Sequence, residues 1–190
     1  MLILILGLLL FFVPHSISIV NEPWRNRMVA RLGEPRWQSI YSAVALAGFV
    51  LIIWGYGLAR HNPMVIYTPS SGLRHLSMLL MLPVFTLLIA TYAPSRIRDV
   101  TQHPMLLATL LWAVAHLLAI GTLHDVILFG SFLLWAAADR LSMVYRVQRP
   151  LHGLPASRFN DILAIVAGLA LYIAFIAGVH GWLIGVPLVW

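Results

Sequence analysis

Six apolar runs, each about as long as a bilayer is thick, constrain this 190-residue chain more than any other feature. A transmembrane helix needs about 20 mainly apolar residues, because the hydrocarbon core is about 30 Å thick and a helix rises about 1.5 Å per residue. We therefore predict an all-α integral membrane protein, a single domain over residues 1–190 built as a bundle of six transmembrane helices. The predicted spans are residues 1–20, 38–59, 74–93, 104–121, 125–143 and 161–184.

The composition excludes an ordinary soluble domain. Hydrophobic residues make up 61% of the chain and charged residues only 9%, whereas soluble domains carry about a quarter charged residues. The absence of cysteine excludes disulfides and thiolate metal ligands. The net charge is +6, and all of the Lys and Arg charge is arginine. Basic residues accumulate in the cytoplasmic loops of membrane proteins. We therefore expect the lipid bilayer as a partner and no nucleic acid.

The arginines are distributed unevenly among the loops. Ten of the twelve follow the first, third and fifth runs, and only Arg60 and Arg74 lie in the loop after the second. Because basic loops stay in the cytoplasm, both termini are predicted to lie outside it. Residues 1–20 lack a leading positive charge and a small-residue cleavage site, so we expect a retained first helix. The predicted location is the bacterial inner membrane, with both termini in the periplasm.

Two histidines, His15 and His116, lie deep inside predicted spans. At about 1.5 Å per residue, His15 lies about 21 Å along the first span, and His116 lies about 18 Å beyond Pro104 in the fourth. The two depths differ by less than about 10 Å in a slab about 30 Å thick, and a helix tilt of about 20° closes that gap. Two imidazoles at similar depth on neighbouring helices can ligate one haem iron from opposite faces.

The same two histidines have a simpler interpretation, in which each donates a hydrogen bond between helices and only supports packing. A mononuclear zinc site is less favoured, because it needs three or four protein ligands and the spans offer no third deep ligand. Haem needs only one or two axial ligands and fits the available residues better. The sequence leaves the packing and the haem interpretations open.

His103 begins the fourth run directly before Pro104, which is a normal helix start. Its role is either helix entry or the binding of a haem propionate or anionic substrate, together with Arg96 and Arg98. About 1300° of helical rotation separates His103 from His116, so the two cannot ligate one metal. The other histidines fall in loops or near span ends, where solvated or interfacial roles are expected: His61, His75, His124, His152 and His180.

Asp139 lies near the end of the fifth run, and a carboxylate at this depth is expected to pair with an arginine. The candidates are Arg140 and an arginine of the following loop. Aromatic residues of the fourth and fifth runs are candidates to flank a porphyrin or a polyene, although packing is their commoner role: Trp112, Phe129, Phe132 and Trp135.

Four segments together resemble the NnrU family of membrane proteins over essentially the whole chain: FFVPHS, PWRNRMVARLG, HPMLLATLLWAVAHLLAIG and LFGSFLLWAAADR. The resemblance implies a link to bacterial denitrification and nitric oxide metabolism. The same domain forms a plant zeta-carotene isomerase, a haem b enzyme whose iron ligands are histidines of the first span and of a WxxAH-type segment. In this chain those positions are His15 and His116.

The chain departs from the plant enzyme at two places. A cysteine three residues before the second ligand is replaced by Ala113, and a histidine pair before the LFG motif is replaced by Val126 and Ile127. The resemblance therefore implies haem binding without cysteine-assisted isomerase chemistry.

The sequence favours a haem b-binding membrane protein of NnrU type, linked to nitric oxide or denitrification metabolism. Haem ligation would be by His15 and His116, with His103, Trp112 and Arg98 in the cofactor pocket. One alternative is a non-catalytic assembly factor for a membrane nitric oxide reductase, with membrane respiratory or denitrification proteins as partners. Another is a haem isomerase like the zeta-carotene enzyme. A small transporter is less favoured, because the spans hold no chain of buried carboxylates. Whether the protein is an enzyme stays open.

Overall fold

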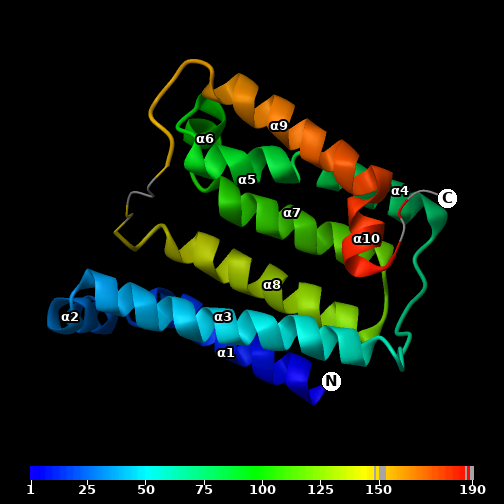
Figure 1. Ribbon diagram of the computed structural model, residues 1–190, viewed down its shortest axis with the longest axis horizontal. Helices are drawn as coiled ribbons and strands as arrows, with labels where there is room; N and C mark the ends of the chain where they lie inside the picture. The colour runs from blue at the N-terminus through cyan, green and yellow to red at the C-terminus, as the bar shows by residue number, and fades with distance from the viewer. Residues whose placement is uncertain (148, 150–152, 187, 189–190) are drawn as a thin grey trace. The chain divides into compact units, whose positions relative to one another are not determined.

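A computed structural model describes residues 1–147, 149, 153–186 and 188 (Figure 1). Every named element in these residues is helical, and the described residues hold one isolated β-bridge, between Val65 and Thr122. The all-α class is therefore confirmed. The elements are α1 (Leu2–Val20), α2 (Glu22–Leu32), α3 (Glu34–Ala59), α4 (Ser71–Met81), α5 (Val84–Tyr92), α6 (Arg96–Thr101), α7 (Pro104–Ala119), α8 (Leu123–Ser142), α9 (Asn160–Ala174), the π-helical turn η1 (Phe175–Val179) and α10 (His180–Ile184).

Each of the six predicted spans coincides with a helix or with consecutive helices. Four helices in the described residues are long and apolar enough to cross a membrane: Leu2–Val20, Glu34–Ala59, Ser71–Tyr92 and Asn160–Ile184. The fourth predicted span is the shorter apolar helix α7, of 16 residues. The fifth is α8, which carries Asp125, Asp139 and Arg140 and is not among the four. The count of six spans stays a prediction.

Most side chains of the four candidate spans face outward, and not into the protein. The exposed fraction is 58% for Leu9, 58% for Ile53 and 62% for Val166. Exposed apolar side chains on this scale are typical of a surface that lipid covers.

The two short helices α2 and α6 lie in loops that were not predicted to be helical. Asn21 begins α2 by accepting a hydrogen bond from the backbone N–H of Trp24 at 3.0 Å.

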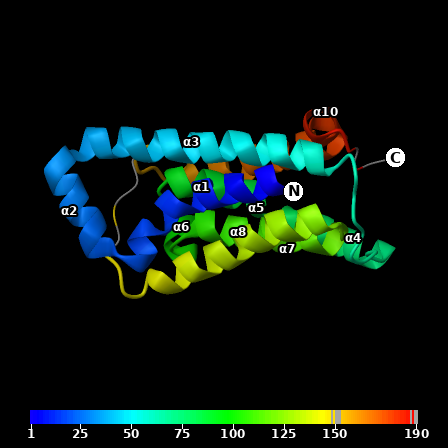
Figure 2. The same cartoon turned by 90° about the horizontal axis from the view of Figure 1, so that it is seen from below.

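The chain divides into two compact units, which are described separately. Unit 1 comprises the described residues of Met1–Pro69 and Ile120–Gln148, and unit 2 those of Ser70–Ala119 and Arg149–Trp190. In unit 1, α1 contacts both α3 and α8 (Figure 2). The backbones of α1 and α3 approach closely at three glycines. A Cβ atom would lie 2.6 Å from the Ile52 nitrogen at Gly7, 2.5 Å from the Phe11 nitrogen at Gly48 and 2.3 Å from the Leu4 nitrogen at Gly55.

The helix α8 runs parallel to α1 in unit 1. Phe12 contacts Phe132 with ring centroids 4.9 Å apart, and His15 contacts Trp135 at 5.7 Å. Both contact pairs advance along the two helices in the same direction. This arrangement brings the deep histidine of α1 next to an aromatic residue of α8.

Unit 2 is built around the packing of α5 against α7 and α9. Its core consists of Val84, Leu87 and Ala108, with Trp112 of α7 packed against them. Gly168 of α9 lies against the backbone of Thr86, where a Cβ atom would come within 2.6 Å of the Thr86 Cα. These contacts fix α7, the helix that carries His116.

Candidate functional site

The hydrogen bond made by His15 determines its tautomer. His15 Nδ1 lies 2.6 Å from the backbone carbonyl oxygen of Phe11, one helical turn earlier. A carbonyl can only accept, so Nδ1 carries the proton and donates it. The neutral ring then has its lone pair on Nε2, the atom that can bind a metal. The Phe11 ring stacks on the imidazole at 4.2 Å and limits its rotation.

Side chains of two other helices complete the surroundings of His15. Trp135 of α8 meets the imidazole edge to face, and Tyr41 of α3 lies 5.1 Å away between ring centroids. His15 is half-buried among these rings. All of these contacts lie within unit 1.

A buried ion pair lies one turn beyond Trp135 on the same face of α8. Arg146, in the turn after α8, donates from Nη2 to Oδ1 of Asp139. Ser142 donates to the backbone carbonyl of Asp139 at 2.7 Å and to its carboxylate at 3.4 Å. The predicted pairing of Asp139 with an arginine is confirmed, and the partner is the loop residue Arg146.

Two nitrogens, one in Trp135 and one in this ion pair, are buried without an acceptor in the described part of the chain. They are the indole Nε1 of Trp135 and the guanidinium Nε of Arg146. A buried donor without a partner costs about 1–3 kcal/mol. Such donors therefore mark a place where a ligand oxygen would be stabilised.

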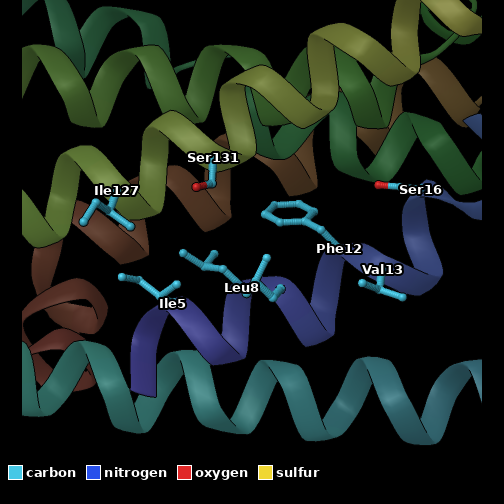
Figure 3. A pocket seen from close by; sticks show the side chains of 8 residues that line it. Ile5, Leu8, Phe12, Val13, Ser16, Ile127 and Ser131 are labelled. Atoms are coloured by element: carbon cyan, nitrogen blue, oxygen red, sulfur yellow. The ribbon is translucent and has the colours of Figure 1, made fainter. Parts of the chain in front are cut away.

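An apolar groove of about 300 Å³ lies between α1 and α8 in unit 1 (Figure 3). Phe12 is part of the groove and stacks on Trp135 at 5.7 Å, so the groove is continuous with the aromatic surroundings of His15. Among the described residues that line it, Ser16 and Ser131 are the ones with hydroxyl groups. The groove is lined by Ile5, Leu8, Leu9, Phe12, Val13, Ser16, Ile127 and Ser131.

His116 has the same local hydrogen bond as His15. Its Nδ1 lies 2.8 Å from the carbonyl oxygen of Trp112, one turn earlier on α7. Nδ1 is again the donor, so the lone pair of the neutral ring is on Nε2. The Trp112 ring lies 5.2 Å from the imidazole and is also packed against the core of unit 2. Trp112 and His116 are therefore neighbours on one face of α7, and their role in a cofactor pocket stays a prediction.

The structure does not bring His103 to His116. His103 precedes α7, where its carbonyl accepts a hydrogen bond from the Leu107 N–H at 3.2 Å. Thirteen residues of helix, about 20 Å at 1.5 Å per residue, separate it from His116. Arg98 lies on α6, where its N–H is capped by Ser95 at 3.3 Å. The roles predicted for His103 and Arg98 in cofactor binding stay predictions.

His15 belongs to unit 1 and His116 to unit 2. Ligation of one iron by both histidines therefore stays a prediction. Within the described residues, no group of three or more His, Asp and Glu side chains is arranged to hold a metal ion. A site with one or two histidine ligands, which is what haem needs, does not require such a group.

The expectation that His124 is a solvated loop residue was wrong. His124 lies in the first turn of α8 and is only 4% exposed, and the adjacent Asp125 is 1% exposed. Tyr56 of α3 donates to Oδ1 of Asp125 at 2.6 Å, and the Thr122 hydroxyl donates to Oδ2. His124 Nε2 lies 3.8 Å from the same carboxylate. The sequence signal for this cluster was a carboxylate at the start of an apolar run. His152 lies outside the described residues.

One comparison with known proteins identifies a family. The chain matches the model of the NnrU protein family over residues 3–188, which is nearly its whole length. No curated protein and no solved structure matches it. On the strength of the family match, this chain is a member of the NnrU protein family.

Proposed function

We propose that this protein binds haem b in the bacterial inner membrane, with the Nε2 atoms of His15 and His116 as the axial ligands. The observation that supports this proposal is the shared tautomer of the two histidines. Each donates Nδ1–H to a backbone carbonyl one turn earlier, at 2.6 Å for His15 and 2.8 Å for His116. Metal-ligating histidines almost always donate their second ring nitrogen in this way, because that bond fixes the ring and raises its basicity.

The surroundings of His15 fit a porphyrin in two further respects. Its aromatic neighbours Phe11, Tyr41 and Trp135 give the half-buried ring apolar surroundings of the kind that a porphyrin packs against. The unsatisfied donors of Trp135 and Arg146 match the acidic edge of such a cofactor. When bound, haem supplies one-electron transfer or Lewis-acid chemistry, whose potential depends on the axial ligands and on burial.

We also propose six spans with both termini in the periplasm. The contacts of α8 support its role as a span, because Phe132 and Trp135 lie at the depth of Phe12 and His15 on α1. The loop after α3 also pairs with the turn before α8. Leu123 N–H donates to the Met64 carbonyl at 2.8 Å, and Ile66 N–H donates to the Gly121 carbonyl at 2.8 Å. These bonds support a crossing by α7, because a chain that crosses the membrane through α4 and α5 must return to the side of the loop after α3.

The metabolic setting that we propose is nitric oxide or denitrification metabolism. The resemblance in the sequence supports it, together with the replacement of the isomerase cysteine by Ala113. Membrane respiratory or denitrification proteins are the partners that this setting implies. Deletion of the gene should then impair growth on nitrate or raise sensitivity to nitric oxide. Normal nitric oxide metabolism in the deletion strain would contradict this setting while leaving the cofactor proposal intact.

An absorption spectrum of the detergent-purified protein, oxidised and reduced, tests the cofactor directly. We expect the sharp bands of a six-coordinate low-spin haem in the reduced protein. His15→Ala and His116→Ala should each remove the low-spin signature, and the double variant should bind little haem. His61→Ala, in the exposed loop after α3, is the matched control and should keep the wild-type spectrum. Full low-spin absorbance in both single variants would overturn the proposal.

A further inference from the structure

We propose that Trp135 and Arg146 form a carboxylate-binding subsite beside His15, which orients an amphipathic ligand. The identity of the ligand rests on the proposed function: the carboxylate would be a propionate of haem. A free oxyanion such as nitrite offers similar chemistry and is the other possible source. The first observation is that the two donors, the Trp135 indole Nε1 and the Arg146 Nε, are buried and have no acceptor in the described residues.

The positions of these donors connect them to His15. Trp135 and Asp139 are one turn apart on the same face of α8, and Arg146 is held at that face by its ion pair with Asp139. The Trp135 ring itself contacts His15. Both donors therefore belong to the part of unit 1 that also contacts His15.

The charge of the pair favours a tethered carboxylate over a free anion. Asp139 neutralises Arg146 and occupies Nη2, but a guanidinium has five N–H donors and can serve a second carboxylate through another edge. Because Asp139 also repels an incoming anion, the intrinsic affinity of the subsite for a free anion is low. A carboxylate attached to a ligand already held by His15 is present at high effective concentration and binds in spite of this repulsion.

The apolar groove between α1 and α8 would hold the apolar part of the ligand. From Phe12, which stacks on Trp135, the groove extends along α1 toward Ile5 and along α8 toward Ile127 (Figure 3). This face of unit 1 is therefore apolar on one side of Phe12 and carries unsatisfied donors on the other. A ligand with an apolar edge and an acidic edge matches both sides in one orientation only.

The test compares the binding of haem with that of haem dimethyl ester, in which the propionates cannot accept as carboxylates. We expect the wild-type protein to bind haem about tenfold or more tightly than the ester, the effect of one or two hydrogen bonds to a charged group. Trp135→Phe removes the indole N–H and keeps a smaller aromatic ring, and Arg146→Lys keeps a cation for Asp139 but removes Nε. Both variants should lower the ratio of the two affinities toward one. Trp54→Phe, at a position 57% exposed, should keep the wild-type ratio.

A second arm distinguishes a haem propionate from a free oxyanion and stays informative if no haem binds. The apoprotein, labelled with ¹⁵N at its indoles, is titrated with nitrite and with acetate, and the Trp135 resonance is assigned by its loss in Trp135→Phe. A saturable shift of the Trp135 indole resonance, together with a haem-to-ester affinity ratio that the two variants leave unchanged, would identify a free oxyanion as the occupant. A wild-type protein that binds neither haem nor its ester would refute the proposed function alone. Unchanged affinity ratios in both variants, together with no saturable shift, would overturn the subsite.

Discussion

The indole of Trp135 and the imidazole of His15 meet edge to face, with ring centroids 5.7 Å apart and an angle of 88° between the planes. This contact joins α8 to α1 at the depth of the candidate ligand. It also sets a buried indole N–H next to a histidine whose tautomer is fixed by the Phe11 carbonyl. These contacts of His15 lie within unit 1 and can be tested by substitutions in that unit.

Replacing Trp135 by alanine should destabilise the protein by about 3 kcal/mol, because the indole fills space between α1 and α8. Thermal unfolding of the detergent-purified protein measures this effect. Trp54→Ala, at a position 57% exposed on α3, should shift the midpoint much less. Equal shifts in the two variants would show that Trp135 does not support the packing of α8.

Gly55→Ala should disrupt the contact between α1 and α3. The new Cβ would lie 2.3 Å from the Leu4 nitrogen, so the helix backbones must separate. Overpacking of this kind costs about 1–3 kcal/mol. Gly57→Ala is a matched control two residues away, where a Cβ meets nothing within 4 Å. We expect a lower midpoint for Gly55→Ala and an unchanged or slightly higher one for Gly57→Ala, and the reverse order would contradict this packing.

Tyr56→Phe should destabilise the protein by about 1–3 kcal/mol, because it leaves the buried Asp125 carboxylate without one of its donors. Tyr145→Phe, at a position 90% exposed, is the control and should be neutral. Chemical denaturation in mild detergent measures the free energy of unfolding of both variants. A neutral Tyr56→Phe variant would indicate that another group, such as water, replaces the hydroxyl.

The positions of the helices were predictable because length and apolar composition are local properties. The predicted span at 161–184, for example, coincides with α9 through α10, Asn160–Ile184. The helix α2 was missed, although Asn21 followed by Glu22 and Pro23 is a recognisable helix start. A short polar helix between two apolar runs carries no length signal of its own.

The burial of His124 was not predictable in the same way. It depends on Tyr56, which is far away in the sequence and contacts His124 with ring centroids 5.2 Å apart. The sequence left two candidates for the partner of Asp139, namely Arg140 and an arginine of the following loop. The pairing with Arg146 depends on the turn that follows α8. Similarly, the tautomers of His15 and His116 follow from helix geometry and side-chain rotamers, which no residue pattern specifies.

The ion pair between Asp139 and Arg146 should show strong coupling in a double-mutant cycle. Asp139→Ala leaves a buried guanidinium without its anion, a loss that typically costs about 3–5 kcal/mol. Arg146→Ala leaves the carboxylate unpaired in the same way. The double variant should be less destabilised than the sum of the single variants, because neither charge then remains alone. Additive effects would show that the pair contributes little to stability in the membrane.

The six-span topology can be decided with single introduced cysteines, because the chain has none of its own. Met64 is 61% exposed after α3, Val100 is 84% exposed on α6 and Tyr145 is 90% exposed after α8. A membrane-impermeant maleimide should label Met64→Cys in intact spheroplasts, and Val100→Cys and Tyr145→Cys only after permeabilisation. Ile120→Cys, beside the Gly121 carbonyl that bonds the loop after α3, is the decisive variant. Labelling of Ile120→Cys from outside requires α7 and α8 to cross the membrane, whereas labelling only after permeabilisation would leave four spans.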